Sequence, residues 1–166
     1  MRYYDTFDSP YGGMLLAASE RGLSGVYFNR QKYHPKRGAG WQHAPDNAHL
    51  KKAKKQLAEY FAGKRRDFDL ALDPAGSSFQ KRVWKEIAGV PYGETISYGE
   101  LARRAGFPEG ARAAGAATGR NPIGIIVPCH RIVGSNGKLT GYAGGLDKKR
   151  ALLALESGER DLLSAA

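Results

Sequence analysis

The pattern of apolar and polar positions in the first third of the chain is typical of strands. Short apolar runs over 14–18 and 23–28 are separated by glycine-containing turns, and the second run partly alternates. Residues 31–46 are polar and contain Gly, Pro and His, as expected of a loop. Residues 67–72 form a further candidate strand. The first 30 residues by themselves predict a meander of two or three antiparallel strands.

One helix is predicted beside these strands. Apolar side chains recur at spacings of three and four after Asn47, which is a favourable N-cap residue, and Gly63 ends the pattern. The apolar positions are Leu50, Ala53, Leu57 and Phe61. The run Asp73-Pro74-Ala75-Gly76 is the best linker in the chain. We therefore expect two domains, over 1–76 and 77–166.

The second domain has a helical pattern. Ser78 is the expected N-cap of a helix with an apolar face, which Gly89 and Pro91 end. Ser97 stands three residues before Glu100, the spacing of a capping box, and predicts a helix from 98 to about 105. A second short helix follows over 109–118. Two short helices joined by a tight turn are typical of a helix-turn-helix, although an ordinary helical hairpin fits the pattern equally well.

The second of these short helices has almost no large side chains. Its run Ala111-Arg112-Ala113-Ala114-Gly115-Ala116-Ala117 contains a single large residue. Such a surface lets another backbone approach closely, either a packed helix or the wall of a DNA groove. Arg112 is then either an ordinary exposed arginine or a side chain that wedges into a duplex.

The only cysteine follows a β-branched run. Residues 125–127 predict a buried strand, and Pro128 favours a turn that would lift Cys129 out of the strand end. A free thiol is mostly protonated at neutral pH, so a nucleophile needs a nearby base or positive charge. His130 serves as that base only if the chain turns or a water bridges the two, since strand neighbours point to opposite faces. A lone cysteine is often a small core residue, but the polar neighbours here favour a nucleophile.

The C-terminal region supplies a loop, a helix and a carboxylate. The run Gly141-Tyr142-Ala143-Gly144-Gly145 lacks the lysine and spacing of a phosphate loop, and it suits a flexible wall over a flat ligand. Asp147 is the expected cap of a last helix, with Leu152 and Leu155 facing the core. Glu156 lies near the same face, so it needs a partner if it is buried, and His130 is the candidate.

Composition narrows the functional classes. The 166 residues carry a formal net charge of +10, which favours a polyanionic partner such as DNA or RNA. A hydrophobic fraction of 42% is that of a globular chain rather than a disordered one. No apolar run is long enough to cross a membrane and the start lacks a secretion signal, so we expect a cytoplasmic protein without a membrane partner. A single cysteine excludes an internal disulfide and a multi-cysteine metal site.

Five motifs occur in an order that identifies a family. They are Tyr92-Gly93-Glu94-Thr95-Ile96-Ser97-Tyr98, Ala111-Arg112-Ala113, Gly119-Arg120-Asn121-Pro122, Pro128-Cys129-His130-Arg131 and Gly141-Tyr142-Ala143-Gly144-Gly145. Through them, residues 78–158 resemble the O6-alkylguanine-DNA alkyltransferases. The resemblance implies an α+β fold, with an N-terminal ribonuclease H-like domain of antiparallel sheet and helix. The C-terminal domain would be helical, with a winged helix-turn-helix.

The resemblance also implies residue roles. Cys129 would accept the alkyl group, His130 would deprotonate it through a water, and Glu156 would orient His130. Asn121 would brace the active-site turn, and Tyr98 would act on the flanking phosphate and on the base. Arg112 would fill the gap left by the extruded base. Contacts with DNA or the base are further implied for Ser97, Tyr98, Ala113, Gly115, Ile132, Tyr142, Ala143, Gly144 and Lys149.

The implied activity is DNA repair in a single turnover. The partner would be duplex DNA containing O6-alkylguanine, entered from the minor groove, with O4-alkylthymine as a second candidate lesion. We expect a monomer that needs no cofactor and no metal. Ala143 stands where some members have Ser, which leaves the substrate preference open. Three alternatives remain at this stage: a helix-turn-helix regulator, a Cys-His hydrolase and a non-reacting damage sensor.

Overall fold

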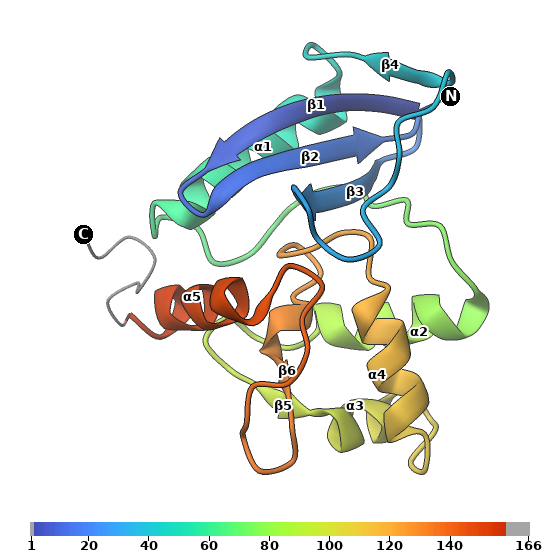
Figure 1. Cartoon of the computed structure of the whole chain (residues 1–166), viewed down its shortest axis with the longest axis vertical. Helices are drawn as coiled ribbons and strands as arrows, with labels where there is room; N and C mark the ends of the chain where they lie inside the picture. The colour runs from blue at the N-terminus through green and yellow to red at the C-terminus, as the bar shows by residue number, and fades with distance from the viewer. Residues whose placement is uncertain (1, 159–166) are drawn as a thin grey trace.

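The computed structural model of the chain describes residues 2–158. The end of the expected second domain, 159–166, lies outside the described residues. Figure 1 shows two layers: a curved sheet with one helix behind it, and a group of short helices below.

The upper layer is a four-stranded sheet. Its strands are β1 (Arg2–Ser9), β2 (Gly12–Ala18), β3 (Leu23–Phe28) and β4 (Trp41–His43), in the order β3-β2-β1-β4. The first three form the predicted antiparallel meander, whereas β4 pairs parallel with β1. The prediction of a loop over 31–46 is therefore wrong for its short strand β4, which the polar run Trp41-Gln42-His43 did not reveal.

Helix α1 (Ala48–Phe61) covers one face of this sheet. Its N-cap and its apolar face are those predicted from the sequence. The Asn47 side chain accepts hydrogen bonds from the backbone N–H groups of His49 and Leu50, which otherwise lack partners in the first turn. The predicted apolar positions Leu50, Ala53 and Leu57 are fully buried. Tyr60 is buried as well, at 0% exposure, and the apolar spacing alone did not mark it for a special role.

The lower layer holds the helices of the second half. They are α2 (Ser78–Ala88), α3 (Tyr98–Arg104), α4 (Ala111–Gly119), the short 3-10 helix η1 (Cys129–Arg131) and α5 (Leu146–Ser157). Two-residue strands β5 (Ile96–Ser97) and β6 (Ile132–Val133) pair in parallel. A buried hydrogen bond of 2.8 Å from Trp84 Nε1 to the carbonyl of Ala117 fixes α4 on α2.

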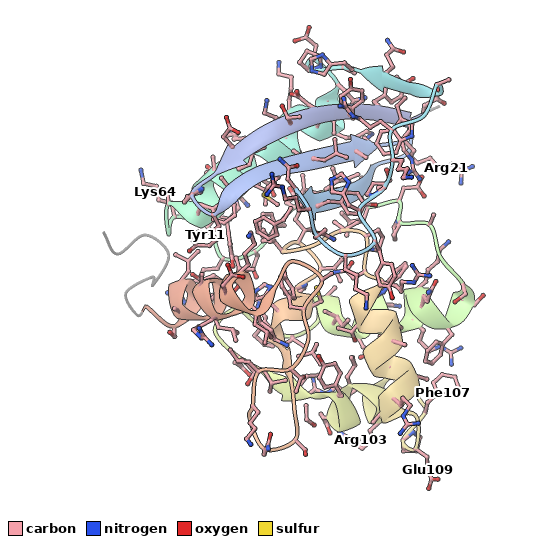
Figure 2. All side chains as sticks on the ribbon, in the orientation of Figure 1. Tyr11, Arg21, Lys64, Arg103, Phe107 and Glu109 are labelled. Atoms are coloured by element: carbon pink, nitrogen blue, oxygen red, sulfur yellow. The ribbon has the colours of Figure 1, made fainter. Side chains whose placement is uncertain are left out.

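Helices α3 and α4 form the predicted helix-turn-helix unit. Gly106 ends α3 with a φ of +87°, a left-handed conformation that glycine adopts without steric cost. The turn carries Phe107 and Glu109 at the far edge of the molecule (Figure 2). Ring contact between Phe107 and Phe79, with centroids 5.0 Å apart, holds the turn against α2.

The two layers share one apolar core. Val26 of β3 forms a parallel bridge with Ile123, and its N–H donates to the Pro122 carbonyl at 2.8 Å. Leu16 and Val26 from the sheet and Ile123 and Ile132 from the lower layer belong to the same buried cluster. The sheet is therefore a rigid support for the segment that leads to Cys129.

Several local expectations need correction. Residues 67–72 are not a strand, because only Leu72 bridges, to Leu23, and the chain beside it is largely exposed. The cap of α2 is Ser77 rather than Ser78, and Ser77 forms a full capping box with Gln80. The cap of α5 is Gly145, and Asp147 lies in the first turn without a capping bond. Helix α4 begins at Ala111, two residues later than expected, and ends at Gly119.

The predicted capping box of α3 is only half formed. Ser97 accepts a hydrogen bond from the Glu100 N–H at 3.0 Å, as expected. The Glu100 carboxylate instead accepts from Arg103 and Arg104, its neighbours at i+3 and i+4. Two guanidinium partners attract the carboxylate more strongly than the single backbone N–H of the box does.

Candidate active site

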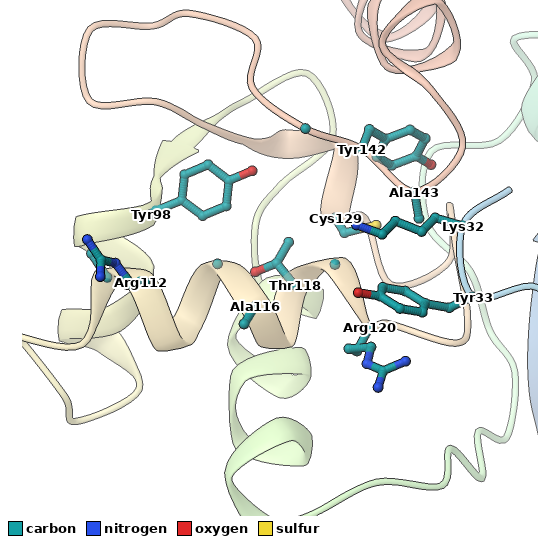
Figure 3. Close-up of a pocket in the computed structure, with 14 residues that line it drawn as sticks. Lys32, Tyr33, Tyr98, Arg112, Ala116, Thr118, Arg120, Cys129, Tyr142 and Ala143 are labelled. Carbon is teal, nitrogen blue, oxygen red and sulfur yellow. The ribbon is translucent and has the colours of Figure 1, made fainter.

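A large hollow lies beside Cys129. It has a volume of about 780 Å³ and runs along α4 from Arg112 at one end to Arg120 at the other (Figure 3). Six predicted site residues line it: Tyr98, Arg112, Gly115, Cys129, Tyr142 and Ala143. Segments far apart in sequence are thus brought to one cavity.

The segment that presents Cys129 is a turn and not the predicted strand. Residues 124–126 form a turn, and Ile125 has a φ of +69°, which a β-branched residue rarely adopts. Asn121 holds this turn: Nδ2 donates to the Val127 carbonyl at 2.8 Å, and Oδ1 accepts from the Ile123 N–H at 3.0 Å. A strand prediction failed because apolar content alone does not distinguish a buried strand from a buried turn.

Cys129 begins η1 directly after this turn. Its side chain faces the cavity, although the residue is only 7% exposed, so the turn does not lift it into solvent as expected. Burial raises the pKa of the Cys129 thiol, and the Asn121 amide and the positive charge of Lys149 act against that rise. The thiol is therefore protonated at neutral pH and needs a base before it can act as a nucleophile.

His130 and Glu156 form the predicted pair. His130 Nε2 and Glu156 Oε2 are 2.6 Å apart, and both side chains are buried. Burial lowers the pKa of His130, against the opposing effect of Glu156. With Nε2–H donating to the carboxylate, Nδ1 carries the free lone pair, and this atom is buried with no partner among the described residues. The neutral ring is thus ready to accept a proton at Nδ1.

Two further side chains bind Glu156, and neither of these bonds was predicted from the sequence. Arg131 donates from Nε to Oε1 at 2.7 Å and from Nη2 to Oε2 at 2.9 Å. Tyr60, from α1 of the upper layer, donates from its hydroxyl to Oε2 at 2.6 Å. Burial works against the charged carboxylate, but His130 and Arg131 hold the pKa of Glu156 well below its ordinary value. No sequence motif links Tyr60 to Glu156, since 96 positions separate them.

Lys149 is a buried cation near Tyr98 and Cys129. Its Nζ donates to the carbonyls of Ile132 at 2.6 Å and Thr140 at 2.9 Å. Burial lowers the pKa of Lys149 to about 8. Tyr98 lies close by, with the Lys149 ammonium 5.9 Å from its ring centroid. Lys149 therefore fixes the loop after β6 and supplies positive charge near the thiol.

The outer face of α4 is as bare as the sequence indicates. Arg112, Ala113 and Ala116 are exposed, whereas Ala114 and Ala117 pack inward. The Tyr98 ring lies over Gly115, where an added Cβ would meet it at 3.6 Å. Arg112 extends from the end of α4 away from Cys129 (Figure 3).

The remaining residues expected to contact DNA or the base lie near the cavity, but some of their polar groups already have hydrogen-bond partners within the protein. The Ile132 carbonyl accepts from Lys149, and the Ala143 carbonyl accepts from the Lys32 N–H at 2.9 Å. A carbonyl oxygen has two lone pairs, so each can accept one more hydrogen bond. Gly144 lies behind Tyr142 and Phe28, which a Cβ there would meet at 2.8 and 3.1 Å. Ser97 is occupied as the cap of α3.

The N-terminal half also contributes to the cavity wall. Lys32 and Tyr33 line it from the loop after β3, and the Arg120 guanidinium stacks 3.9 Å from the Tyr33 ring centroid. These three residues lie at the Cys129 end of the cavity (Figure 3). Neither Lys32 nor Tyr33 belongs to a motif, so only the folded structure reveals their position.

Neither a metal-binding cluster nor a membrane-spanning helix is found in residues 2–158. No group of three or more His, Cys, Asp or Glu side chains is arranged to hold a metal ion in this part of the chain. Among the helices of the same range, none has the length and apolar character needed to span a bilayer.

The second half of the chain combines a helix-turn-helix, whose second helix is bare, with a buried thiol and a His–Glu pair. This combination defines a DNA-binding domain with a reactive cysteine. Comparison with known proteins agrees with this class. The family profile "6-O-methylguanine DNA methyltransferase, DNA binding domain" matches residues 78–158, and "6-O-methylguanine DNA methyltransferase, ribonuclease-like domain" matches 2–74. The chain therefore belongs to the methylated-DNA–protein-cysteine methyltransferase family.

Individual relatives are similar to this chain over nearly its whole length. A methylated-DNA–protein-cysteine methyltransferase of Mycolicibacterium paratuberculosis is 51% identical over 92% of this chain and 91% of its own. One of Methanosarcina acetivorans is 49% identical over 93% and 97%. The crystal structure of Mycobacterium tuberculosis OGT in complex with DNA superposes with a TM-score of 0.88, at 46% identity, over 99% of both chains. The α+β fold with an N-terminal ribonuclease-like domain is thereby confirmed.

Proposed function

We propose that this protein repairs DNA by transferring an alkyl group from O6 of guanine to Cys129, once per molecule. The observation that carries the proposal is a thiol on the wall of a cavity beside α4, one residue from the buried His130–Glu156 pair. Relatives that share about half of the sequence are named for the same transfer, from methylated DNA to a protein cysteine.

The reaction begins with a proton transfer. His130 Nδ1 takes the thiol proton through a bridging water, because the side chains of adjacent residues do not meet directly. Glu156 accepts the Nε2 proton in a hydrogen bond, which fixes the tautomer and stabilises the imidazolium that forms. The charge of Lys149 stabilises the thiolate as it appears.

The group transfer then proceeds by displacement at carbon. The thiolate forms a C–S bond as the bond from that carbon to guanine O6 breaks, and the bonding electron pair leaves with guanine. Guanine takes a proton from solvent at a ring nitrogen and His130 releases the thiol proton to solvent, so the products are an intact guanine and a thioether on Cys129. A thioether is a poor electrophile and none of the sequence motifs supplies chemistry that cleaves one, so each molecule reacts once.

Duplex DNA is the partner that fits this geometry. A base can reach Cys129 only if it leaves the stack, at a cost of a few kcal/mol. We propose that α4 lies in the minor groove, where its small side chains allow close approach, and that Arg112 fills the space of the extruded base. Few side chains on this face can read base edges, so phosphate contacts dominate binding and make it strongly salt-dependent.

Mass spectrometry of the intact protein tests the central claim. After incubation with duplex DNA containing O6-methylguanine, we expect one added methyl group, located on Cys129, and no further turnover. Cys129→Ala should bind the same DNA without reacting. An unmodified thiol, or repeated turnover, would contradict the proposal.

The proposal extends to the oligomeric state, the domain boundary, the cellular location and a second lesion. We propose a monomer with a boundary near residue 76, acting in the cytoplasm, where a catalytic thiol stays reduced. O4-alkylthymine is the second lesion to assay. Light scattering of the protein alone tests the monomer, and a dimer matched to half-sites would instead favour a regulator.

A further inference from the structure

The sheet-bearing half of the molecule contributes one side chain to the proton relay. Tyr60 lies in the last turn of α1 and is fully buried. Its hydroxyl donates to Glu156 Oε2 at 2.6 Å, in a hydrogen bond that joins the two layers. Ninety-six positions separate these residues in the chain, so docking of the layers completes the carboxylate's set of donors.

Three donors converge on the same carboxylate oxygen. Oε2 accepts from the Tyr60 hydroxyl, from His130 Nε2 at 2.6 Å and from Arg131 Nη2 at 2.9 Å. Each donor stabilises the negative charge, so less of that charge remains to stabilise a protonated His130. A carboxylate bound to His130 alone would favour the imidazolium, which cannot accept a proton from the thiol.

We propose that Tyr60 is a positioning residue that acts through Glu156 to hold His130 in the neutral form required of a base. The proposal rests on the proposed function for its kinetic test, since His130 must take the thiol proton. It gives the N-terminal layer a direct part in the chemistry besides its structural support of the active-site turn.

The hydroxyl is a constant donor over the working pH range. Burial and the neighbouring Glu156 raise the pKa of Tyr60 well above its ordinary value, so it stays protonated. The other titratable or charged groups that act on Tyr60, His130 or Glu156 are Arg131 of η1, Lys149 of α5, Tyr142 of the glycine-rich loop and Tyr92 before β5. Of these four, only Arg131 is bonded to the Glu156 carboxylate.

Tyr60→Phe removes the hydroxyl and keeps the ring. Without this donor, Glu156 becomes more basic and the pKa of His130 rises. The acid limb of the pH profile is the range in which the transfer rate falls because His130 becomes protonated. In Tyr60→Phe this limb should lie at a pH higher by about one unit. Transfer would fall by as much as about tenfold at the acid end of the profile and stay within about twofold near pH 8.5. A purely structural loss would lower the rate by the same factor at every pH.

Tyr92→Phe is the matched control. The Tyr92 ring packs against Tyr60 with centroids 6.2 Å apart, but none of the described hydrogen bonds joins its hydroxyl to Glu156. This variant should leave the acid limb at the wild-type pH. Circular dichroism on heating establishes that both variants are folded at the assay temperature.

A double-mutant cycle tests whether the effect passes through Glu156. In a Glu156→Gln background, Tyr60→Phe should no longer shift the acid limb, because the carboxylate it acts on is gone. NMR titration of the His130 ring in the unreacted protein gives a readout independent of transfer, and Tyr60→Phe should raise that pKa by the same amount.

The outcomes separate the two proposals. An unmethylated wild-type Cys129 would refute the proposed function, while the NMR titration would still decide on Tyr60. Normal transfer with an unmoved acid limb and an unmoved His130 titration would refute the role of Tyr60 alone. A shift that persists in the Glu156→Gln background would equally refute it, since Glu156 would not be the intermediary.

Discussion

The side chain of Asn121 holds the carbonyl of Val127 across the active-site turn, with a hydrogen bond of 2.8 Å. Between them lies Ile125 in a left-handed conformation, which is unfavourable for a β-branched residue. The position of Cys129 therefore depends on the Asn121 amide, which also acts on the thiol itself.

Asn121→Ala should loosen this turn, because the buried Ile123 N–H loses its acceptor and the Val127 carbonyl keeps only the Cys129 N–H as a donor. We expect the free energy of unfolding to fall by about 2 kcal/mol and alkyl transfer to slow by about tenfold or more. Urea unfolding and single-turnover transfer measure the two effects. Asn136→Ala is the control, since Asn136 also bonds a backbone N–H but lies in an exposed turn; an equal loss in both variants would remove the special role of Asn121.

Arg112→Ala should impair reaction with duplex DNA more than reaction with the free alkylated base. Arg112 is exposed at the far end of the cavity, so it cannot act on the thiol itself. We expect about a tenfold or larger slowing in duplex DNA and little change for the free base. Arg150→Ala removes an equal charge from an exposed site on α5. If Arg112→Ala slowed the reactions with duplex DNA and with the free base equally, Arg112 would not be the side chain that fills the space of the extruded base.

Ala113→Leu tests the need for a bare surface on α4. Ala113 is exposed, so a larger side chain should leave stability within about 0.5 kcal/mol. Affinity for duplex DNA should fall by about tenfold, because the helix can no longer lie close to the groove wall. Ala58→Leu, on the exposed face of α1, is the control. Unchanged binding in a fluorescence titration would place the DNA on another face.

Glu156→Gln should destabilise the protein in a pH-dependent way. The folded pKa of Glu156 lies well below the ordinary value of 4.5. Its contribution is therefore complete above about pH 4.5 and is lost as the pH falls toward the folded value. Near pH 7 we expect a loss of about 3 kcal/mol, because Arg131 stays buried without a counter-charge.

The measurement for this variant is urea unfolding from pH 7 down to pH 3. The gap between wild type and Glu156→Gln should narrow below about pH 4.5. The exposed Glu100→Gln, which breaks ion pairs with Arg103 and Arg104, should have a smaller effect. A gap that stays constant with pH would mean that the Glu156 charge contributes nothing to folding.

Local sequence predicted most elements correctly where short-range chemistry decides them. Asn47 as a cap, the apolar positions of α1 and the glycine-ended turn of the helix-turn-helix all follow from interactions within a few residues. The motif around Cys129 likewise marked the thiol and His130. These features need no knowledge of distant contacts.

Tertiary structure decided the rest. The run 125–127 is a turn because Asn121 supplies hydrogen bonds that a strand would take from a neighbour. Tyr60, Lys32 and Tyr33 reach the site only because the sheet packs on the helices, and no spacing in the chain encodes that meeting. The amino-acid order by itself thus determined the helices and the reactive motif, through interactions between near neighbours. Only folding set the protonation of the thiol and its base, since burial and partners from distant segments control both.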